Sequence, residues 1–398
     1  MIRYAVAAIA LVSAAPLLAE THTIAAGEGA QERLQEALIL AEPGDTVVLE
    51  AGRFELTDGL SLDVDNVTLK GAGMNASVLD FTNQSGAGEG LLVTSDGVTL
   101  RDFAIENAKG DGIKSKGADQ IIYHALRVEW TNGPDASNGA YGIYPVEARD
   151  ILVQDSYVRG ASDAGIYVGQ SENIIVRRNR VVENVAGIEI ENSNFAEVTE
   201  NLTTRNTGGI LVFDLPGLPK VGGGSVLVAR NAVIDNNTDN FAPEGNIVAS
   251  VPAGTGVMVM ANTKVHVREN ALVNNGTAHI VLTAYTQEFE DDRYQPLPVD
   301  VVISGNVYGR GGFAPDIPGG DMLKAAYGDD LPAVLTDGRH EKLLMLDFQP
   351  IFSLGLTDLG QSYSDAKPQA GVPDVPALKP PLASLSISLP EGMEARLN

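Results

Sequence analysis

A short hydrophobic phrase recurs along the chain, in which a glycine is followed directly by leucine, isoleucine or valine. The copies begin at Gly90, Gly112, Gly142, Gly165, Gly187, Gly209 and Gly256. Successive copies are separated by 22, 30, 23, 22, 22 and 47 residues, and the last interval is close to two periods. A fixed period of this length is typical of a solenoid, in which each repeat packs only on its neighbours.

A second marker keeps the same phase. Stretches rich in β-branched residues end at Asn179, Asn201, Asn231, Asn270 and Asn306, and Ser156 occupies the equivalent place. The step from the repeated glycine to this marker is 14 residues in four of the turns. A third short strand is expected about two residues later, as at Val158 and Val181.

Three short strands within one period leave no room for the helix that a βαβ unit requires. We therefore predict an all-β fold, a parallel β-helix of about nine coils of 22–23 residues. A propeller would instead have a period of roughly 40 residues. The aliphatic residue after each repeated glycine should point into the core, and the asparagines should form an internal ladder of paired amides.

The ends of the solenoid need covers, because their outermost strands would otherwise expose the core. Residues 30–41 carry Leu34, Leu38 and Ala41 at helical spacing, which predicts an amphipathic capping helix. The period is lost after Asn306. We expect the β-helix with its capping helix to span residues 20–308, an irregular C-terminal wrap to span 309–366, and a proline-rich tail to span 367–398.

Residues 1–19 have the composition of a secretory signal peptide, with Arg3 followed by an apolar run and small residues near Ala19. We therefore expect a periplasmic or secreted protein with no membrane span. The formal net charge is −25, and the chain has no cysteine. Such an acidic chain is a poor partner for nucleic acid or an anionic membrane, and no disulfide can form.

The segment PGDTVVLEAGRFEL at residues 43–56, the glycine-isoleucine coils and the asparagine marker together resemble the pectate-lyase-like superfamily. The resemblance covers residues 24–308 and implies a right-handed parallel β-helix. It extends to uncharacterised secreted bacterial β-helix proteins and distantly to alginate C5-epimerases. The epimerase motif is matched at Tyr141, Gly142 and Pro145, whereas Tyr144 and Val146 replace its acid and its histidine.

The superfamily also contains polysaccharide lyases and glycosidases, so the resemblance implies a carbohydrate polymer as the partner. The spacing between the two repeated markers lengthens at four places. The insertions there are expected to border the glycine-isoleucine strands and to form the walls of a groove. These insertions are residues 131–140, 214–223, 235–253 and 284–298. The repeated glycines are expected to point outward and keep the floor of this groove shallow.

Strand alternation divides the outward face of these strands into two halves. Towards the C-terminus, Leu211, Phe213, Met258 and Met260 form an apolar patch that loops or the C-terminal wrap should cover. The N-terminal half is polar and aromatic, which suits a glycan because aromatic faces stack on sugars and carboxylates and amides bind hydroxyls.

Two sets of candidate site residues follow from this pattern. The catalytic candidates are Lys114, Tyr144, Tyr167, Glu189 and Glu191. The substrate-binding candidates are Lys116, Trp130, Tyr141, Asp163, Gln170, Asn192 and Asp214. Trp130 suits either a sugar-stacking platform or a loop anchor.

The chemistry of these residues leaves several alternatives open. Two glutamates two positions apart on a strand lie about 6.5–7 Å apart, within the range for inverting glycosidases. With Asp163 or Asp214, the same pair would also offer hard oxygen ligands to Ca²⁺. Lys114 or Tyr144 would serve as the base of a β-elimination if its pKa were lowered. A non-catalytic binding, scaffold or accessory protein, with a merely solvated sheet face, is the alternative to an enzyme.

Overall fold

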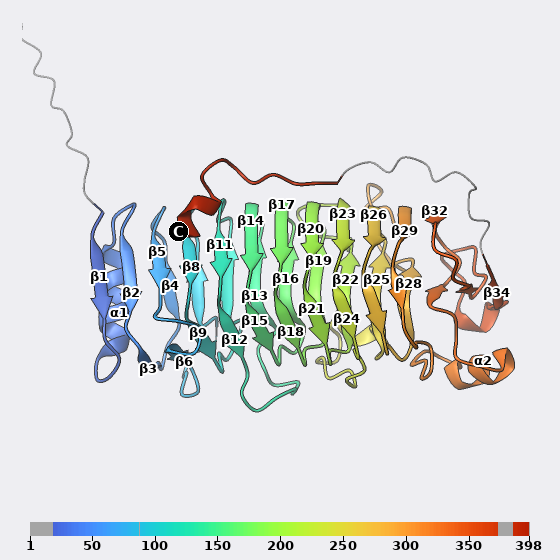
Figure 1. The fold of residues 1–398 in the computed structure, drawn as a ribbon, viewed down its shortest axis with the longest axis horizontal. Helices are drawn as coiled ribbons and strands as arrows, with labels where there is room; N and C mark the ends of the chain where they lie inside the picture. Colours follow the sequence, from blue (N-terminus) through green and yellow to red (C-terminus); the bar gives the residue numbers. More distant parts are fainter. Residues whose placement is uncertain (1–18, 87, 373–384, 398) are drawn as a thin grey trace, which may run out of the picture.

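The computed structural model describes residues 19–86, 88–372 and 385–397, and it forms an elongated rod (Figure 1). Residues 1–18, which make up nearly all of the expected signal peptide, lie outside the described residues. Three long sheets run along the rod, and we name them sheets A, B and C. Within the described residues, no helix is long and apolar enough to cross a membrane.

Sheet A contains β1 (Thr21–Ile24), β2 (Thr46–Leu49), β5 (Thr68–Lys70), β8 (Thr99–Arg101), β11 (Ile122–His124), β14 (Arg149–Gln154), β17 (Glu172–Arg177), β20 (Asn194–Thr199), β23 (Gly224–Ala229), β26 (Thr263–Arg268), β29 (Val299–Ser304) and β32 (Glu341–Met345). Sheet B contains β3 (Gly52–Glu55), β6 (Ser77–Asp80), β9 (Ala104–Glu106), β12 (Arg127–Glu129), β15 (Tyr157–Arg159), β18 (Arg180–Val182), β21 (Leu202–Thr204), β24 (Ala232–Ile234), β27 (Ala271–Val273) and β30 (Val307–Tyr308).

Sheet C contains β4 (Leu60–Leu62), β7 (Leu91–Val93), β10 (Ile113–Lys116), β13 (Tyr141–Val146), β16 (Ala164–Gly169), β19 (Ala186–Glu191), β22 (Gly208–Phe213), β25 (Thr255–Met260), β28 (Ala278–Thr283), β31 (Val334–Thr336), β33 (Ile351–Ser353) and β34 (Gln369–Gly371). The helices are α1 (Ala30–Leu40), α2 (Gly320–Tyr327) and the short 3₁₀ turns η1 (Ile247–Ser250), η2 (Tyr363–Asp365) and η3 (Glu394–Leu397).

Each coil passes through sheets C, A and B in turn, and β4 to β30 make nine such coils within the described residues. Neighbouring coils pair in parallel, as the pairing of β16 with β19 and of β17 with β20 illustrates. The predicted all-β parallel β-helix of about nine coils is therefore confirmed.

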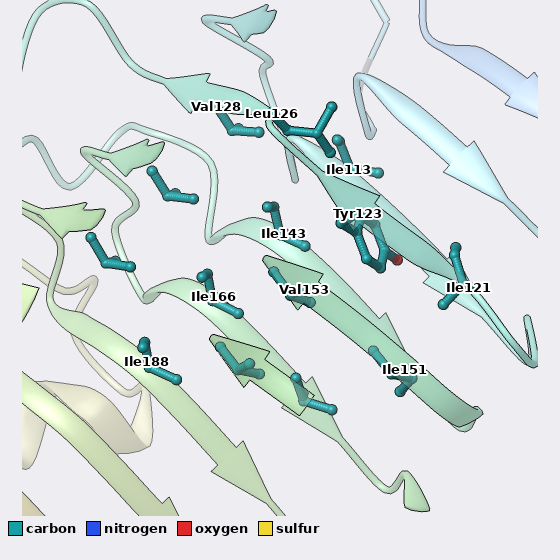
Figure 2. Packing of buried hydrophobic residues seen from close by; sticks show 14 of the residues in the cluster. Ile113, Ile121, Tyr123, Leu126, Val128, Ile143, Ile151, Val153, Ile166 and Ile188 are labelled. Atoms are coloured by element: carbon teal, nitrogen blue, oxygen red, sulfur yellow. The ribbon is translucent and has the colours of Figure 1, made fainter. Parts of the chain in front are cut away.

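The core consists of stacks of equivalent side chains from successive coils (Figure 2). Ile113, Ile143, Ile166 and Ile188 occupy one such stack, and each is fully buried. The register of sheet C places these residues opposite one another. β-branched residues suit this position because they pack well against their neighbours on a pleated surface.

The repeated glycines do not lie on the outer face, which corrects the expectation that they form a groove floor. A Cβ atom on Gly142 would approach Cγ1 of Val158 to 2.3 Å, and one on Gly165 would approach Cγ1 of Val181 to 2.5 Å. Both valines belong to the core. Both glycines lie at the start of a sheet C strand, β13 or β16, and a side chain there would collide with the core.

The expected asparagine ladder is present. Its rungs are Asn179, Asn201, Asn231, Asn270 and Asn306. In each of the last four, the side-chain oxygen accepts one hydrogen bond from the backbone N–H of the preceding asparagine and one from its side-chain amide. The side-chain oxygen of Asn179 accepts one hydrogen bond, from the backbone N–H of Ser156. The amide groups of the rungs also donate to buried carbonyls such as that of Val176. Asp347 ends the ladder by accepting from Asn306.

A second ladder, which the repeat pattern did not predict, lies at the turn between sheets B and C. Asn184, Asn206, Asn236 and Asn275 are linked in the same way at 2.9–3.2 Å. His279 ends this ladder, since its Nδ1 accepts from the amide of Asn275 at 3.1 Å. Both ladders satisfy buried backbone groups at turns that would otherwise lack partners.

The two ends of the β-helix differ. Helix α1 buries Ala30, Leu34, Ala37 and Leu38 against the first coils, as expected of a cap. Beyond residue 308 the structure departs from a wholly irregular wrap, because β31 and β33 extend sheet C and β32 extends sheet A. The long segment before β31, which contains α2, hides this continuation by breaking the period.

The final described segment also differs from a free tail, because residues 385–397 lie along the outer face of sheet A beside its early strands (Figure 1). Met393 packs with Ile122, Leu152 and Ile175, which form an outward apolar row. Polar contacts include the ion pair of Arg177 with Glu394 at 2.6 Å. Residues 373–384 of the expected tail lie outside the described residues.

We expect Asn201→Ala to lower the free energy of unfolding by about 2–4 kcal/mol, because it leaves the N–H of Asn179 and the carbonyl of Val176 buried without partners. Urea denaturation followed by fluorescence measures this change. Asn83→Ala removes an exposed amide and should change the midpoint little. Equal effects of the two substitutions would show that the ladder does not stabilise the fold.

We expect Met393→Asp to detach the C-terminal segment, because it places a charge against the apolar row of sheet A. Hydrogen–deuterium exchange should then show lost protection across residues 385–397, including the N–H of Ile387 that donates to Glu197. Glu391→Asp alters an exposed residue of the same segment and should keep the protection. Unchanged exchange in Met393→Asp would contradict the proposed packing.

Candidate functional site

The expected insertions enter the chain at the two ends of the sheet C strands. Residues 131–140 and 235–254 precede β13 and β25, and residues 214–223 and 284–298 follow β22 and β28. Residues 309–333 precede β31 and form a further wall on the same side. This wall was not predicted, because the repeat period is lost after Asn306. The outer face of sheet C is therefore bordered by loops on a rigid scaffold, the usual setting of a binding site.

Three carboxyl groups meet on the outer face of sheet C, and we name them the acidic cluster. Asp163 precedes β16 directly, and Glu189 and Glu191 lie on β19. The strand turns these two glutamates outward because Ile188 and Ile190, which alternate with them along β19, occupy the core. The residues are deeply buried nonetheless, at 6%, 2% and 7% exposure in sequence order.

The hydrogen bonds of the acidic cluster are unequal. The Tyr167 hydroxyl donates to Glu191 Oε1 at 2.6 Å, and the Tyr141 hydroxyl lies 3.5 Å from Asp163 Oδ2. Glu189 Oε2 is buried without a hydrogen-bond partner among the described residues. A buried carboxylate without partners is strongly destabilised, so the protonated form of Glu189 is favoured.

Burial raises the pKa values of all three residues of the acidic cluster, and charge repulsion adds to the effect at Asp163 and Glu189. Burial raises the pKa of Glu191 to about 7, and burial together with the charge of Glu191 raises the pKa of Asp163 to about 7. Burial and the charges of Asp163 and Glu191 hold the pKa of Glu189 well above its usual range. The cluster therefore retains protons at neutral pH, as a general acid requires.

Three tyrosines cover the acidic cluster on its N-terminal side. The ring centroids of Tyr141, Tyr144 and Tyr167 lie 4.5–4.9 Å from one another. Burial and nearby carboxylates raise the pKa of Tyr144 to about 12, and they raise the pKa values of Tyr141 and Tyr167 as well. A base role for Tyr144 required a lowered pKa, whereas burial and nearby carboxylates raise it, so this phenol is a hydrogen-bond donor at neutral pH.

Lys114 lies beside Tyr144 at a more open edge of the site. Its Nζ atom is 3.1 Å from Glu89 and 3.8 Å from Asp111, and it lies 5.0 Å from the ring centroid of Tyr144. Burial raises the pKa of Asp111 to about 6, with the charge of Glu89 adding to the effect. Lys114 and Glu89 are about a quarter exposed, so this edge is accessible to a ligand.

Asp111 and Glu89 were absent from the sequence-based candidates. The position directly before the repeated glycine also faces outward, as the outer packing of Ala164 and Ala186 shows. Asp111 occupies this position before Gly112. Examination of this third outward row, in addition to the two rows after the glycine, would have found Asp111.

Three substrate-binding candidates have structural roles instead. Trp130 is 4% exposed and donates from Nε1 to the carbonyl of Ala108 at 2.7 Å, so it anchors its loop and offers no stacking face. Asn192 donates to two carbonyls of the 214–223 loop, those of Leu215 and Lys220. Asp214 accepts from the N–H of Gly223 at 2.6 Å and closes the same loop.

The remaining candidates lie at the margins of the site. Lys116 is exposed and pairs with Glu147 at 3.5 Å. Gln170 follows β16 in a left-handed backbone conformation, and its Oε1 atom is buried without a hydrogen-bond partner among the described residues. Burial raises the pKa of Asp214 to about 7, with a smaller effect of Glu191.

The 235–254 loop folds over the C-terminal side of the acidic cluster. Asn246 donates to Asp163 at 3.3 Å, and Val248 and Val251 pack in one apolar cluster with Tyr167 and Leu211. The expectation that loops cover the outward apolar patch is confirmed, since Leu211, Phe213 and Met258 are at most 5% exposed.

In the part of the chain that the structure describes, no group of three or more histidine, cysteine, aspartate and glutamate side chains is arranged to hold a metal ion. Binding of Ca²⁺ therefore stays a prediction from the sequence.

These features define the class of protein, a parallel β-helix that carries a buried acidic cluster on the loop-walled face of one sheet. Residues 65–217 match the family model of the right handed beta helix region, which confirms the expected right-handed parallel β-helix. No curated protein sequence matches the chain.

Solved structures share this fold at low sequence identity. The A-modules of the mannuronan C-5 epimerases AlgE4 and AlgE6 from Azotobacter vinelandii have TM-scores of 0.50 and 0.52, with 16% and 15% identity. Each match covers 79% of this chain, and 91% and 89% of the respective modules. The catalytic unit of a GH87 alpha-1,3-glucanase from Streptomyces thermodiastaticus has a TM-score of 0.52 and 13% identity, over 84% of this chain and 54% of that one. The expected distant resemblance to alginate C5-epimerases is thus confirmed for the fold.

We expect the protein to be less stable at pH 8 than at pH 5 because of the acidic cluster. The folded state keeps protons up to about pH 7 at Asp163 and Glu191, whereas the unfolded chain releases them near pH 4. The contribution to stability is therefore present below the unfolded pKa and is lost as the pH rises through the folded pKa.

Urea midpoints at pH 5 and pH 8 measure this loss. Glu191→Gln, which cannot ionise, should show a smaller drop than the wild type, while Glu341→Gln at an exposed site should keep the full drop. The same drop in all three proteins would contradict the assignment to the acidic cluster.

Proposed function

We propose that the protein binds a carbohydrate polymer along the outer face of sheet C and hydrolyses a glycosidic bond there by acid–base catalysis. The observation that carries the proposal is the acidic cluster, in which burial and the charges of Asp163 and Glu191 hold the pKa of Glu189 well above its usual range and burial raises the pKa of Glu191 to about 7. Carboxyl groups whose environments shift their pKa values towards neutrality are suited to exchange protons with a substrate.

In this proposal Glu189 acts as the general acid that protonates the leaving oxygen, and Glu191 acts as the base that activates water. Neighbours on one face of a strand are about 6.5–7 Å apart, which suits an inverting reaction. The Tyr167 hydroxyl, 2.6 Å from Glu191, stabilises the ionised form of this base. The open edge around Lys114, Asp111 and Tyr144 would bind sugar hydroxyls and a ring face.

Hydrolysis is favoured over β-elimination and epimerisation, both of which need a group that abstracts a carbon-bound proton. The pKa values of Tyr141, Tyr144 and Tyr167 are raised, so these side chains do not provide a phenolate base at neutral pH. At the positions where the epimerase motif has an acid and a histidine, this chain has Tyr144 and Val146. The names of the similar structures, two epimerases and a glucanase, add an analogy of fold rather than of site.

A non-catalytic glycan-binding protein is the second candidate, and the deep burial of Glu189 favours it. At 2% exposure, this side chain reaches a substrate only if the segments that cover it move, and the 235–254 loop, whose Asn246 donates to Asp163, borders the same cluster. The exposed side of Asn246 and its single 3.3 Å bond to the cluster are compatible with such a movement. Under the binding-only alternative the loop stays closed and the glycan rests on the open edge near Lys114.

We also propose that the protein acts in the periplasm or outside the cell. The apolar segment after Arg3, followed by small residues near Ala19, supports this location. Glycan polymers are abundant in these compartments, which agrees with the proposed substrate class.

We expect Glu189→Gln to reduce the turnover of a cleaved glycan by about 10²–10⁴-fold while its binding is retained, because the amide cannot donate the catalytic proton. A glycan array identifies the bound polymers, and reducing-end assays with and without Ca²⁺ measure cleavage. Tyr167→Phe should lower the rate and shift the pH dependence of the base Glu191.

Glu341→Gln, at an exposed site on sheet A, should behave as the wild type in both assays. Binding without any product across the glycans tested would overturn the hydrolase and leave the binding protein. Full activity of Glu189→Gln would remove this residue from the mechanism.

A further inference from the structure

A cavity of about 350 Å³ lies over the C-terminal half of sheet C, outside the acidic cluster. Its floor is apolar and comes from Phe213, Met258, Met260 and Val281 on three successive strands, β22, β25 and β28. Residues of the 235–254 and 284–298 loops form part of its walls. The loops that cover the apolar patch thus leave a pocket above it.

The cavity and the acidic cluster belong to one outward row. In sheet C, Glu191 is paired in register with Phe213, and Phe213 with Met260. Adjacent strands are about 4.8 Å apart, so the floor of the cavity begins one strand from Glu191. A ligand held at the cluster can therefore extend a substituent into the cavity.

The chemistry of the cavity favours an apolar occupant. Its volume equals that of roughly a dozen water molecules in the liquid, but water there would find few polar partners on the floor. Methionine side chains adapt their shape to an apolar ligand. Volumes of this size are also typical of small-molecule sites.

The walls suit a hydroxylated sugar ring less well. Asp337 is already engaged, because its Oδ2 atom accepts from Thr283 and from the N–H of Ala284 at 3.0 and 2.9 Å. The Tyr285 ring is 8% exposed and packs edge-on against Tyr294 at 5.5 Å. Asp337 and Tyr285 are therefore not free to bind a sugar, and Asp316, the second carboxylate of the lining, already accepts from the N–H of Ala253 at 2.9 Å. Tyr363, which is 52% exposed, is the lining aromatic that remains accessible.

We propose that the cavity binds an acyl or alkyl substituent carried by the glycan, which places the protein among those that act on apolar-substituted carbohydrates. The inference rests on the proposed function in one respect, namely that the sugar bearing this substituent lies over Glu189 and Glu191. Burial of the substituent adds affinity and fixes the sugar in register with the acidic cluster.

Isothermal titration calorimetry with methyl, butyl and hexyl β-D-glucosides, each below its micelle concentration, tests the cavity directly. We expect affinity to rise about fourfold for each buried methylene, from ~0.8 kcal/mol per CH₂. The experiment measures binding affinity and does not require the protein to cleave the glucoside. Equal affinity for the three glucosides would overturn the proposal.

Two substitutions in the cavity provide the structural test. Met260→Glu places a charge on the floor and should weaken hexyl glucoside binding at least tenfold. Val281→Phe fills the cavity without a charge and should also remove the dependence on chain length. Met322→Glu changes a methionine that is 74% exposed, and it should leave binding unchanged.

Circular dichroism and urea midpoints establish that each variant is folded. Loss of binding in Met322→Glu as large as in Met260→Glu would overturn the proposal, as would chain-length dependence that persists in both folded cavity variants. Glu189→Gln should retain the dependence on chain length. If affinity rises with chain length in a protein that cleaves no glycan, the result supports binding of the substituent in the cavity and contradicts only the proposed hydrolysis.

Discussion

The whole molecule depends on one constraint, which is that each coil must present to the next coil the same kind of side chain at the same place. Parallel strands about 4.8 Å apart allow identical groups to stack, and two asparagine ladders use this spacing to pair amides from coil to coil. Their bonds also satisfy the backbone at the turns. An apolar rung would leave a buried donor or acceptor unpaired.

The same repetition builds the outer surface, but there it places unlike residues in a row. On sheet C, register stacks Tyr167 on Glu189 and Glu189 on Leu211, so aromatic, acidic and apolar regions follow one another along the rod. Strand alternation places Glu189 and Glu191 on the same face, Asp163 lies directly before the neighbouring strand β16, and all three side chains are deeply buried. The raised pKa values of the acidic cluster follow from this burial and proximity.

Much of the fold could be predicted because its signals are local and repeated. The glycine-isoleucine phrase, the asparagines of the first ladder and the capping residues of α1 each appear at a fixed spacing. The continuation beyond residue 308 was missed because the insertion before β31 interrupts that spacing. Packing of residues 385–397 on sheet A was missed because its partners, such as Glu197 and Arg177, lie about 200 residues away.

The sequence by itself determined the coil, its core stacks and the outward direction of Glu189 and Glu191, since period and strand alternation are properties of the chain. Only the tertiary structure decided that the glycines face the core and that Trp130 is an anchor. It also decided the burial of the acidic cluster and the cavity beside it. The reason is physical: burial and electrostatic coupling depend on which loops cover which coils, and no local pattern specifies that packing.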